Sequence, residues 1–349
     1  MSPLEHRFLL NAGRGTGAFF HLDESDRERL SVEVFSDEAL RTSAIEGEIL
    51  DRASVQSSIM RQLGLTSDRR RIPPAEAGIA ELIIDVYRTT AKPLSESMLF
   101  RWHRMLALTR IADVGKFRTG NDLMQIVSGR IGAEKVHFEA PPSAQVSSEM
   151  NRYIEWFNSM ISGTGLALLA LTRAGIAHLY FESIHPFEDG NGRIGRALAE
   201  KALSMAVGQP LIAGLASEIF EKRKSYYAAL EKANREMDIS QWLTWFAQIV
   251  LDAQQHTLEK IEFLIAKSKL LDRLRDQLNA RQQKALLRLL EAGPKGFEGG
   301  LSAGNYGKIT GASPATTTRD LADMVQKGAL IRKGERKHAR YSANLAALE

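Results

Sequence analysis

Apolar residues recur every three or four positions along most of the chain, which is the spacing of helices with one buried face. In residues 26–46 this spacing includes Leu30, Val34 and Ala44, and Gly47 ends the pattern. Similar patterns predict helices over 51–65, 75–90, 95–108, 143–157, 166–184, 193–207, 218–235, 239–272 and 281–291. The range 166–184 is the most apolar and is expected in the core. The sequence therefore predicts a mostly α-helical protein.

Two stretches interrupt the helical pattern. Glycines punctuate residues 115–142, where short apolar runs at 125–127 and 135–138 predict a β-hairpin, called the flap below. Glycines and a proline in 293–301 then end the last long helix. The chain beyond them is predicted to form helices over 305–309 and 313–327 and a hairpin over 330–341, an order that resembles a winged helix.

The predicted elements divide the chain into three parts. Residues 1–74 form an N-terminal helical region that ends in a basic, proline-marked loop. Residues 75–275 form a helical core that carries the flap. Residues 280–349 form a small α+β domain of winged-helix type.

Composition limits the classes of function. The 349 residues are 44% hydrophobic and 25% charged, as in soluble globular proteins. There is no cysteine, which excludes disulfides and thiolate metal sites. No window is apolar enough for a membrane span, and the N-terminus lacks the pattern of a signal peptide, so we expect a cytoplasmic protein without a membrane partner. The net charge of +4 is too small to indicate nucleic acid by itself.

The strongest chemical signal lies between the two most apolar helices. The predicted helix after the loop begins at Asn191, between Gly190 and Gly192. A helix N-terminus presents free N–H groups, and glycine lets an anion approach them closely, so these three residues are predicted to bind phosphate. Arg193 and Arg196 lie three positions apart on the new helix, where both can reach a polyphosphate.

Two further residues of the loop supply reactive groups. Asp189 offers the hard oxygen ligand that Mg²⁺ prefers, and we predict it as the metal ligand. The ordinary pKa of a histidine side chain is near 6.5, so the neutral imidazole of His185 can accept a proton from an attacking hydroxyl. We predict it as the catalytic base. Phe187 and Pro186 are expected only to anchor and stiffen the loop.

The run His185-Pro-Phe-Glu-Asp-Gly-Asn-Gly-Arg-Ile-Gly-Arg196 resembles the Fic family motif at every fixed position. The resemblance implies an all-helical catalytic core with a flap. It also implies a protein adenylyltransferase, which transfers AMP from Mg²⁺-bound ATP to a Ser, Thr or Tyr hydroxyl of a target protein and releases pyrophosphate.

Other segments are similar to parts of the same family. Gly115-Lys-Phe-Arg118 resembles the segment before the flap. The resemblance implies that the flap pairs with the backbone of a target protein, through Val127, Ser128, Gly129, Val136, His137 and Phe138. The run from Arg223 to Asn234 is similar to the family's adenosine pocket, which nominates Tyr227 and Asn234.

Residues 42–47 resemble the family's inhibitory helix, here placed before the core. Thr42, Glu46 and Gly47 are the matching positions. In this arrangement Glu46 would pair with Arg196 and occupy the guanidinium that ATP needs.

Alternatives remain open at this stage. The chain could be a DNA-binding regulator with a vestigial Fic core, or a Fic enzyme that mainly removes AMP or uses another nucleotide donor. Gly192 argues against the phosphate-transferring branch, which carries a bulkier residue there. The basic hairpin and the helix that begins at Ser313 would suit DNA, although winged helices also bind proteins or form homodimers. The sequence identifies neither the target nor the oligomeric state.

Overall fold

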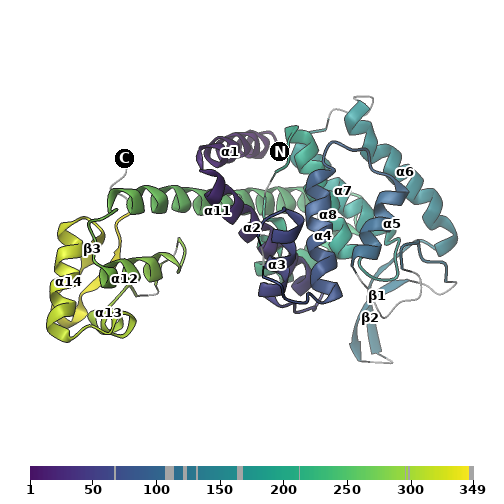
Figure 1. The fold of residues 1–349 in the computed structure, drawn as a ribbon. Helices are drawn as coiled ribbons and strands as arrows, with labels where there is room; N and C mark the ends of the chain where they lie inside the picture. Colours follow the sequence, from purple (N-terminus) through teal and green to yellow (C-terminus); the bar gives the residue numbers. More distant parts are fainter. Residues whose placement is uncertain are drawn as a thin grey trace. The chain divides into compact units, whose positions relative to one another are not determined.

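A computed structural model describes residues 1–66, 68–106, 114–120, 124–130, 133–162, 168–211, 213–294, 296–297 and 299–345 of the chain. These residues are mostly helical, which confirms the predicted fold class (Figure 1). The chain divides into two compact units: Met1–Thr16 with Glu28–Thr257, and Gly17–Arg27 with Leu258–Glu349. The predicted boundaries at 74, 275 and 280 stay predictions.

The first unit is a bundle of helices around α8. Its elements are α1 (Ser2–His21), α2 (Glu24–Ile45), α3 (Arg52–Gln62), α4 (Pro74–Arg88), α5 (Glu96–Met105), α6 (Ser143–Ser162), α7 (Ala170–Ile184), α8 (Asn191–Val207), α9 (Leu215–Glu221), α10 (Arg223–Ala233) and the first part of α11 (Ser240–Arg273). α8 packs most extensively on α7 and also contacts α4, α5, α6 and α9. Ile194, Leu198 and Leu203 are fully buried there, because neighbours surround the helix on every side.

Helix α1 was not predicted, because three glycines weaken its local helical signal. Its place in the bundle comes from tertiary contacts: Phe8 is fully buried, and the Glu5 carboxylate accepts hydrogen bonds from the backbone N–H groups of Ala170 and Leu171. α7 has no side-chain cap of its own, so Glu5 supplies the missing acceptor. The helix predicted over 218–235 is wrong as a single element, since it consists of α9 and α10 with a break at Lys222.

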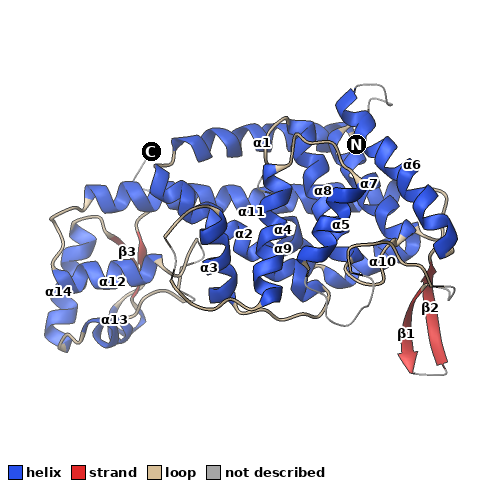
Figure 2. Ribbon diagram, turned by 45° about the vertical axis from the view of Figure 1, so that its right-hand side comes forward, coloured by secondary structure: helices blue, strands red, loops and turns tan. Residues whose placement is uncertain are grey.

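The flap is an antiparallel hairpin of β1 (Gln125–Arg130) and β2 (Ala133–Glu139), as predicted, and it projects from the helices of the first unit (Figure 2). The register shifts between Ile126 and Val127. The side chains of 126–137 lie outside the part that the structure describes.

The second unit contains α12 (Ala280–Leu290), α13 (Ala303–Thr310), α14 (Pro314–Gln326), β3 (Leu330–Lys333), the short 3₁₀ turn Arg336–His338 and β4 (Arg340–Ala343). It also includes the last part of α11 and Gly17–Arg27, where α1 ends and α2 begins. β3 and β4 pair antiparallel, and Leu301 forms an isolated bridge to Tyr341. Leu286, Tyr306 and Met324 are buried in the core of this unit. Three helices followed by a hairpin form the predicted winged-helix-like arrangement.

Among the described residues, no helix combines the length and the apolar character that crossing a bilayer requires.

Candidate active site

The loop between α7 and α8 makes a sharp turn that brings the His185 ring close to the N-terminus of α8. His185 ends α7 with φ 50° and ψ 58°, and Gly190 precedes α8 with φ 85°. A non-glycine residue with positive φ is unfavourable and needs support from its surroundings. Arg118 provides it, because its Nε donates a 2.8 Å hydrogen bond to the His185 carbonyl. The backbone strain at His185 therefore lies at the catalytic position that the sequence predicts.

The middle of the loop is anchored by a buried aromatic ring and an amide. Phe187 is fully buried, and its ring stacks on His103 with centroids 4.1 Å apart. The Asn191 side chain accepts from the Phe187 N–H at 2.9 Å and donates to the Phe187 carbonyl at 2.7 Å. The side-chain amide of Asn191 thus closes the loop. Only the backbone of Asn191 then remains to bind a phosphate. Phe187 is an anchor, as the sequence indicates.

His103 contributes a contact that the sequence did not reveal. Its Nδ1 accepts a 2.8 Å hydrogen bond from the Gly115 N–H, so a proton on Nε2 can be donated to the Asp189 carbonyl at 3.1 Å. Burial lowers the pKa of His103, which favours this neutral form. The ring therefore fixes the backbone of the predicted metal ligand. No motif joins residues 103 and 189, which are 86 positions apart.

The carboxylate of Glu46 lies at the start of α8, where the sequence predicts a phosphate site. A methyl group on Gly192 would fall 2.2 Å from Oε1 of Glu46, so the carboxylate lies directly against this glycine. The same oxygen accepts a 2.7 Å hydrogen bond from Nη2 of Arg196. The carboxylate thus lies beside a helix N-terminus and on a guanidinium, two kinds of group that also bind phosphate oxygens.

Arg196 is held in place by the end of α2. Its Nε donates to Oγ1 of Thr42 at 2.8 Å, and its Nη2 also donates to the Thr42 carbonyl at 2.9 Å. Burial alone would lower the pKa of Arg196, but the charge and hydrogen bond of Glu46, together with the charges of Tyr226 and Glu182, outweigh this effect and the net shift is upward. Gly47, with φ 83°, then turns the chain away from α2. The structure thus brings Arg196 next to the segment that contains Thr42, Glu46 and Gly47. Arg196 and Glu46 are 150 positions apart in the sequence.

A second carboxylate, not predicted from the sequence, engages the other arginine. Nη1 of Arg193 donates to Oε2 of Glu48 at 2.7 Å, and Nη2 lies 3.5 Å from Oδ1 of Asp189. The Arg193 side chain is nearly buried, whereas that of Glu48 is about one third exposed. Both arginines of the motif are therefore occupied by carboxylates of one short segment that follows α2.

The environment of His185 favours its neutral form. Burial lowers the pKa of the imidazole to about 4, so the ring can accept a proton at neutral pH. Its Nδ1 lies 3.9 Å from Oε2 of Glu182 and has no hydrogen-bond partner among the described residues. Burial, with a smaller contribution from the charge of Glu46, raises the pKa of Glu182 to about 8. Glu182 was not singled out from the sequence, because a lone glutamate on a helix carries no signal.

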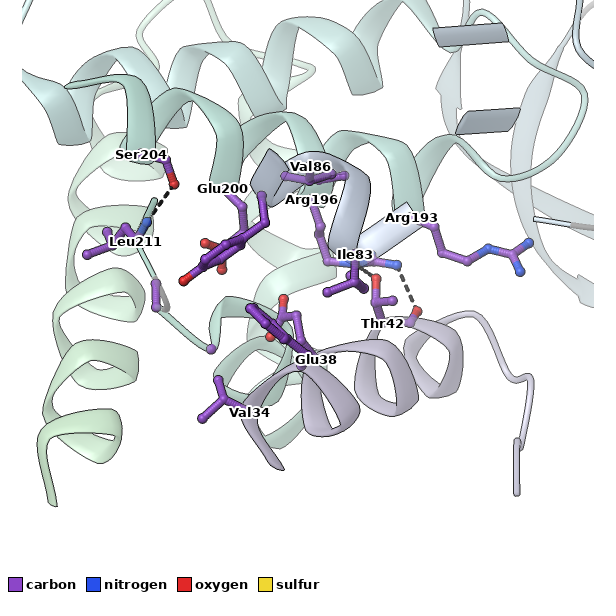
Figure 3. Close-up of a pocket in the computed structure, with 15 residues that line it drawn as sticks. Val34, Glu38, Thr42, Ile83, Val86, Arg193, Arg196, Glu200, Ser204 and Leu211 are labelled. Atoms are coloured by element: carbon purple, nitrogen blue, oxygen red, sulfur yellow. Dashed lines mark hydrogen bonds between the residues drawn. The ribbon is translucent and has the colours of Figure 1, made fainter. Parts of the chain in front are cut away.

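A cavity lies behind Arg196, between α2, α4 and α8 (Figure 3). The carboxylates of Glu38 and Glu200 face it and accept hydrogen bonds from the successive N–H groups of Ala216 and Leu215 at the start of α9. Burial raises the pKa of Glu38 to about 7, and burial together with the charge of Glu38 raises the pKa of Glu200 well above its usual value. The carboxyls of Glu38 and Glu200 thus line the same cavity as Thr42, near the end of α2.

Asp189 is compatible with the predicted magnesium ion. Its side chain is half exposed, and Oδ1 accepts a hydrogen bond from the N–H of Gly190 at 2.5 Å. The described residues contain no group of three or more His, Cys, Asp or Glu side chains arranged for a metal. A single carboxylate beside a phosphate site is a common way to bind Mg²⁺, with the nucleotide supplying the other oxygens.

The two residues predicted to bind adenosine lie near the site with other partners. The Tyr227 hydroxyl donates to the Ile45 carbonyl at 3.3 Å, and burial raises its pKa to about 12. Oδ1 of Asn234 accepts from the Ser183 hydroxyl at 2.9 Å. Tyr227 thus contacts the end of α2, next to the segment that the sequence predicts to be inhibitory.

Residues 93–203 match the model of the Fic/DOC family, and residues 1–65 match that of a domain of unknown function, DUF4172. Residues 93–203 are therefore similar to the Fic/DOC family. The Fic/DOC match includes the whole loop from His185 to Arg196, and the DUF4172 match includes α1, α2 and the carboxylates of Glu46 and Glu48.

The curated relatives that this chain resembles are distant. The chain is 25% identical over 240 residues to the protein adenylyltransferase fic-1 of Caenorhabditis elegans, which is 67% of this chain and 44% of the relative. It is 34% identical over 119 residues to the protein adenylyltransferase Fic of Drosophila melanogaster, 34% of this chain and 22% of the relative. The aligned part therefore spans less than half the length of these relatives.

Solved structures confirm the Fic fold. A Fic family protein from Desulfovibrio desulfuricans G20 aligns with a TM-score of 0.53 and 21% identity, over 98% of this chain and 96% of that one. Fic-1 (aa134–508) of C. elegans aligns with a TM-score of 0.51 and 22% identity, over 74% of this chain and 72% of that one.

Proposed function

We propose that the chain is a protein adenylyltransferase of the Fic/DOC family that is held inactive by its own N-terminal segment. The observation that carries the proposal is the position of the Glu46 carboxylate, against Gly192 and on Arg196. A site that holds a carboxylate through a helix N-terminus and a guanidinium offers the groups that a nucleotide phosphate needs. The adenylyltransferase names of the relatives support the choice of donor.

The chemistry follows from the residues around the cradle. The hydroxyl oxygen of the target attacks the α-phosphorus of ATP, the bond between that phosphorus and the bridging oxygen to the β-phosphate breaks, and pyrophosphate leaves. His185 receives the hydroxyl proton, since burial keeps its imidazole neutral at pH 7. Arg193 and Arg196 neutralise the phosphates once their carboxylate partners have left. Asp189 would hold Mg²⁺, which supplies further charge neutralisation at the phosphates.

The flap is the proposed docking site for the target. β1 and β2 form a two-stranded sheet in the part of the chain that the structure describes, so each strand has an outer edge that can pair with an extended segment. Val127, Ser128 and Gly129 on β1, and Val136, His137 and Phe138 on β2, belong to this hairpin. Backbone pairing would bind a hydroxyl-bearing segment with little demand on its side chains.

The test determines which phosphate of ATP is transferred to protein. A Glu46→Gly variant is incubated with Mg²⁺ and ATP labelled either at the α- or at the γ-phosphate, and protein-bound label is measured. We expect label from the α-position only, with one AMP group added per site by intact mass. Label from the γ-position would show phosphate transfer instead. Parallel reactions with UTP, GTP and CDP-choline test the other donors, and a higher yield with any of them would overturn ATP as donor.

A further inference from the structure

The second unit carries a positive surplus that the catalytic site does not use. Residues 280–349 contain twelve lysines and arginines against six acidic residues, a surplus of six, whereas the whole chain has a surplus of four. The remaining residues are therefore slightly negative. A positive surplus concentrated in one part of the chain favours a polyanion partner.

The two acidic residues of α14, Asp320 and Asp323, both have hydrogen-bond partners within the second unit. Asp320 is buried, and its carboxylate accepts hydrogen bonds from Arg281 at 3.0 Å and from the Tyr306 hydroxyl at 3.0 Å. Asp323 accepts from Gln282 at 2.7 Å and from Lys327 at 2.6 Å. Both carboxylates are thus neutralised by partners, and three of these partners lie on α12 and α13.

The exposed positions of α14 carry no acidic residue in the described structure. They are Pro314, Ala315, Thr318, Arg319, Ala322 and Gln326. Two alanines let a partner approach the helix closely. Threonine, arginine and glutamine side chains can hydrogen-bond to base edges in a major groove. Ser313 caps the first turn through the Thr316 N–H, so the start of the helix is fixed before any partner binds.

The β3–β4 hairpin presents like charges side by side. Only Leu330 is buried on β3, and Arg332 and Lys333 are exposed. Lys333 lies directly opposite Arg340 in the antiparallel register. Like charges in this position repel each other, and a row of phosphates would relieve the repulsion. Arg336 is exposed in the connecting turn, and Glu335 is the one acidic residue of the hairpin.

We propose that the second unit binds duplex DNA, with the exposed face of α14 in the major groove and the β3–β4 hairpin on the adjacent phosphate backbone. α14 contacts β3, so one rigid module presents both surfaces. DNA is favoured over a protein partner because the outer face combines small and hydrogen-bonding side chains with cations, while a protein interface would have an apolar centre. The inference is independent of AMP transfer.

The experiment measures binding of the full chain to a fluorescein-labelled random-sequence duplex of about 20 base pairs by anisotropy, between 50 and 200 mM salt. We expect the logarithm of the association constant to fall linearly with the logarithm of salt concentration. Arg319→Ala and Lys333→Ala should each reduce that slope by about one. Glu335→Gln should tighten binding, because it removes the negative charge from the hairpin. Thermal melting of each variant by circular dichroism checks that it folds.

Lys92→Ala is the matched control, since it removes an equally exposed positive charge from the first unit. Its binding should equal that of the wild type. The inference is overturned if the chain does not bind the duplex at 50 mM salt, or if Lys92→Ala weakens binding as much as Lys333→Ala does. A preference for single-stranded DNA or duplex RNA of the same length would also overturn it. The same holds if Arg319→Ala and Lys333→Ala change the molar mass by light scattering while DNA binding is absent, which would indicate a protein interface.

Discussion

Glu46→Gly is the substitution that tests the inhibitory contact most directly. It removes the carboxylate from Arg196 and opens the space against Gly192, while Thr42 keeps two hydrogen bonds to the guanidinium. Arg196 therefore stays in position to bind a phosphate. The variant should transfer AMP to itself faster than the wild type.

The size of the effect follows from one charged hydrogen bond. The contact of 2.7 Å joins a carboxylate that is 29% exposed to a guanidinium that is 2% exposed. Hydrogen bonds to charged groups contribute roughly 1.5–3 kcal/mol, and the partial exposure of Glu46 favours the lower half of that range. A contribution of about 2 kcal/mol corresponds to roughly a 30-fold change in the fraction of protein able to bind ATP productively.

The assay is automodification with α-labelled ATP at concentrations below saturation, quantified on a gel over time. Glu24→Gly serves as the control, because it removes an exposed carboxylate from the first turn of the same helix. It should behave as the wild type. Equal transfer rates for Glu46→Gly and the wild type, with both proteins folded, would refute inhibition by Glu46. Equal activation by Glu24→Gly would show that loosening α2 is sufficient and that the contact with Arg196 is irrelevant.

Four further outcomes are expected. In the Glu46→Gly background, His185→Ala should abolish transfer with little change in thermal melting, and retained transfer would remove His185 as the base. Because burial lowers the pKa of His185 to about 4, transfer by Glu46→Gly should stay nearly constant from pH 8 to pH 6 and fall only at lower pH; a half-maximal rate at pH 6.5 would contradict this. Glu48→Gln should activate transfer several-fold less than Glu46→Gly, because it frees Arg193 and leaves the carboxylate against Gly192 in place; equal activation would contradict the dominant role of Glu46. In the folded protein the Glu38 carboxyl keeps its proton up to about pH 7, whereas in the unfolded chain it releases the proton near pH 4.5. The carboxyl therefore contributes stability below pH 4.5, and this contribution is lost as the pH rises towards 7. Glu38→Gln should therefore flatten the pH dependence of the free energy of unfolding in urea titrations across that window, and an unchanged slope would show that Glu38 is charged in the folded protein.

Much of the fold could be predicted from local pattern. Helices such as α2, α4 and α14 have apolar stripes at helical spacing and recognisable ends, and the flap has glycines around short apolar runs. α1 was missed because its helical state depends on burying Phe8 and on Glu5 capping α7, neither of which is a local property. The break at Lys222 was missed for a similar reason: its Nζ bridges Glu218 and Asp252, which come from different helices.

The sequence by itself singled out the loop from His185 to Arg196 as the candidate reactive loop, because glycines, arginines and a histidine at fixed spacing around a helix start carry a local chemical meaning. It also proposed the pairing of Glu46 with Arg196, through the resemblance of a short segment. Only the tertiary structure decided that Glu46 lies against Gly192, that Glu48 engages Arg193, and that His103 and Arg118 hold the loop. These contacts join residues that are far apart in the chain. Their distances depend on how the helices pack, which no local pattern encodes.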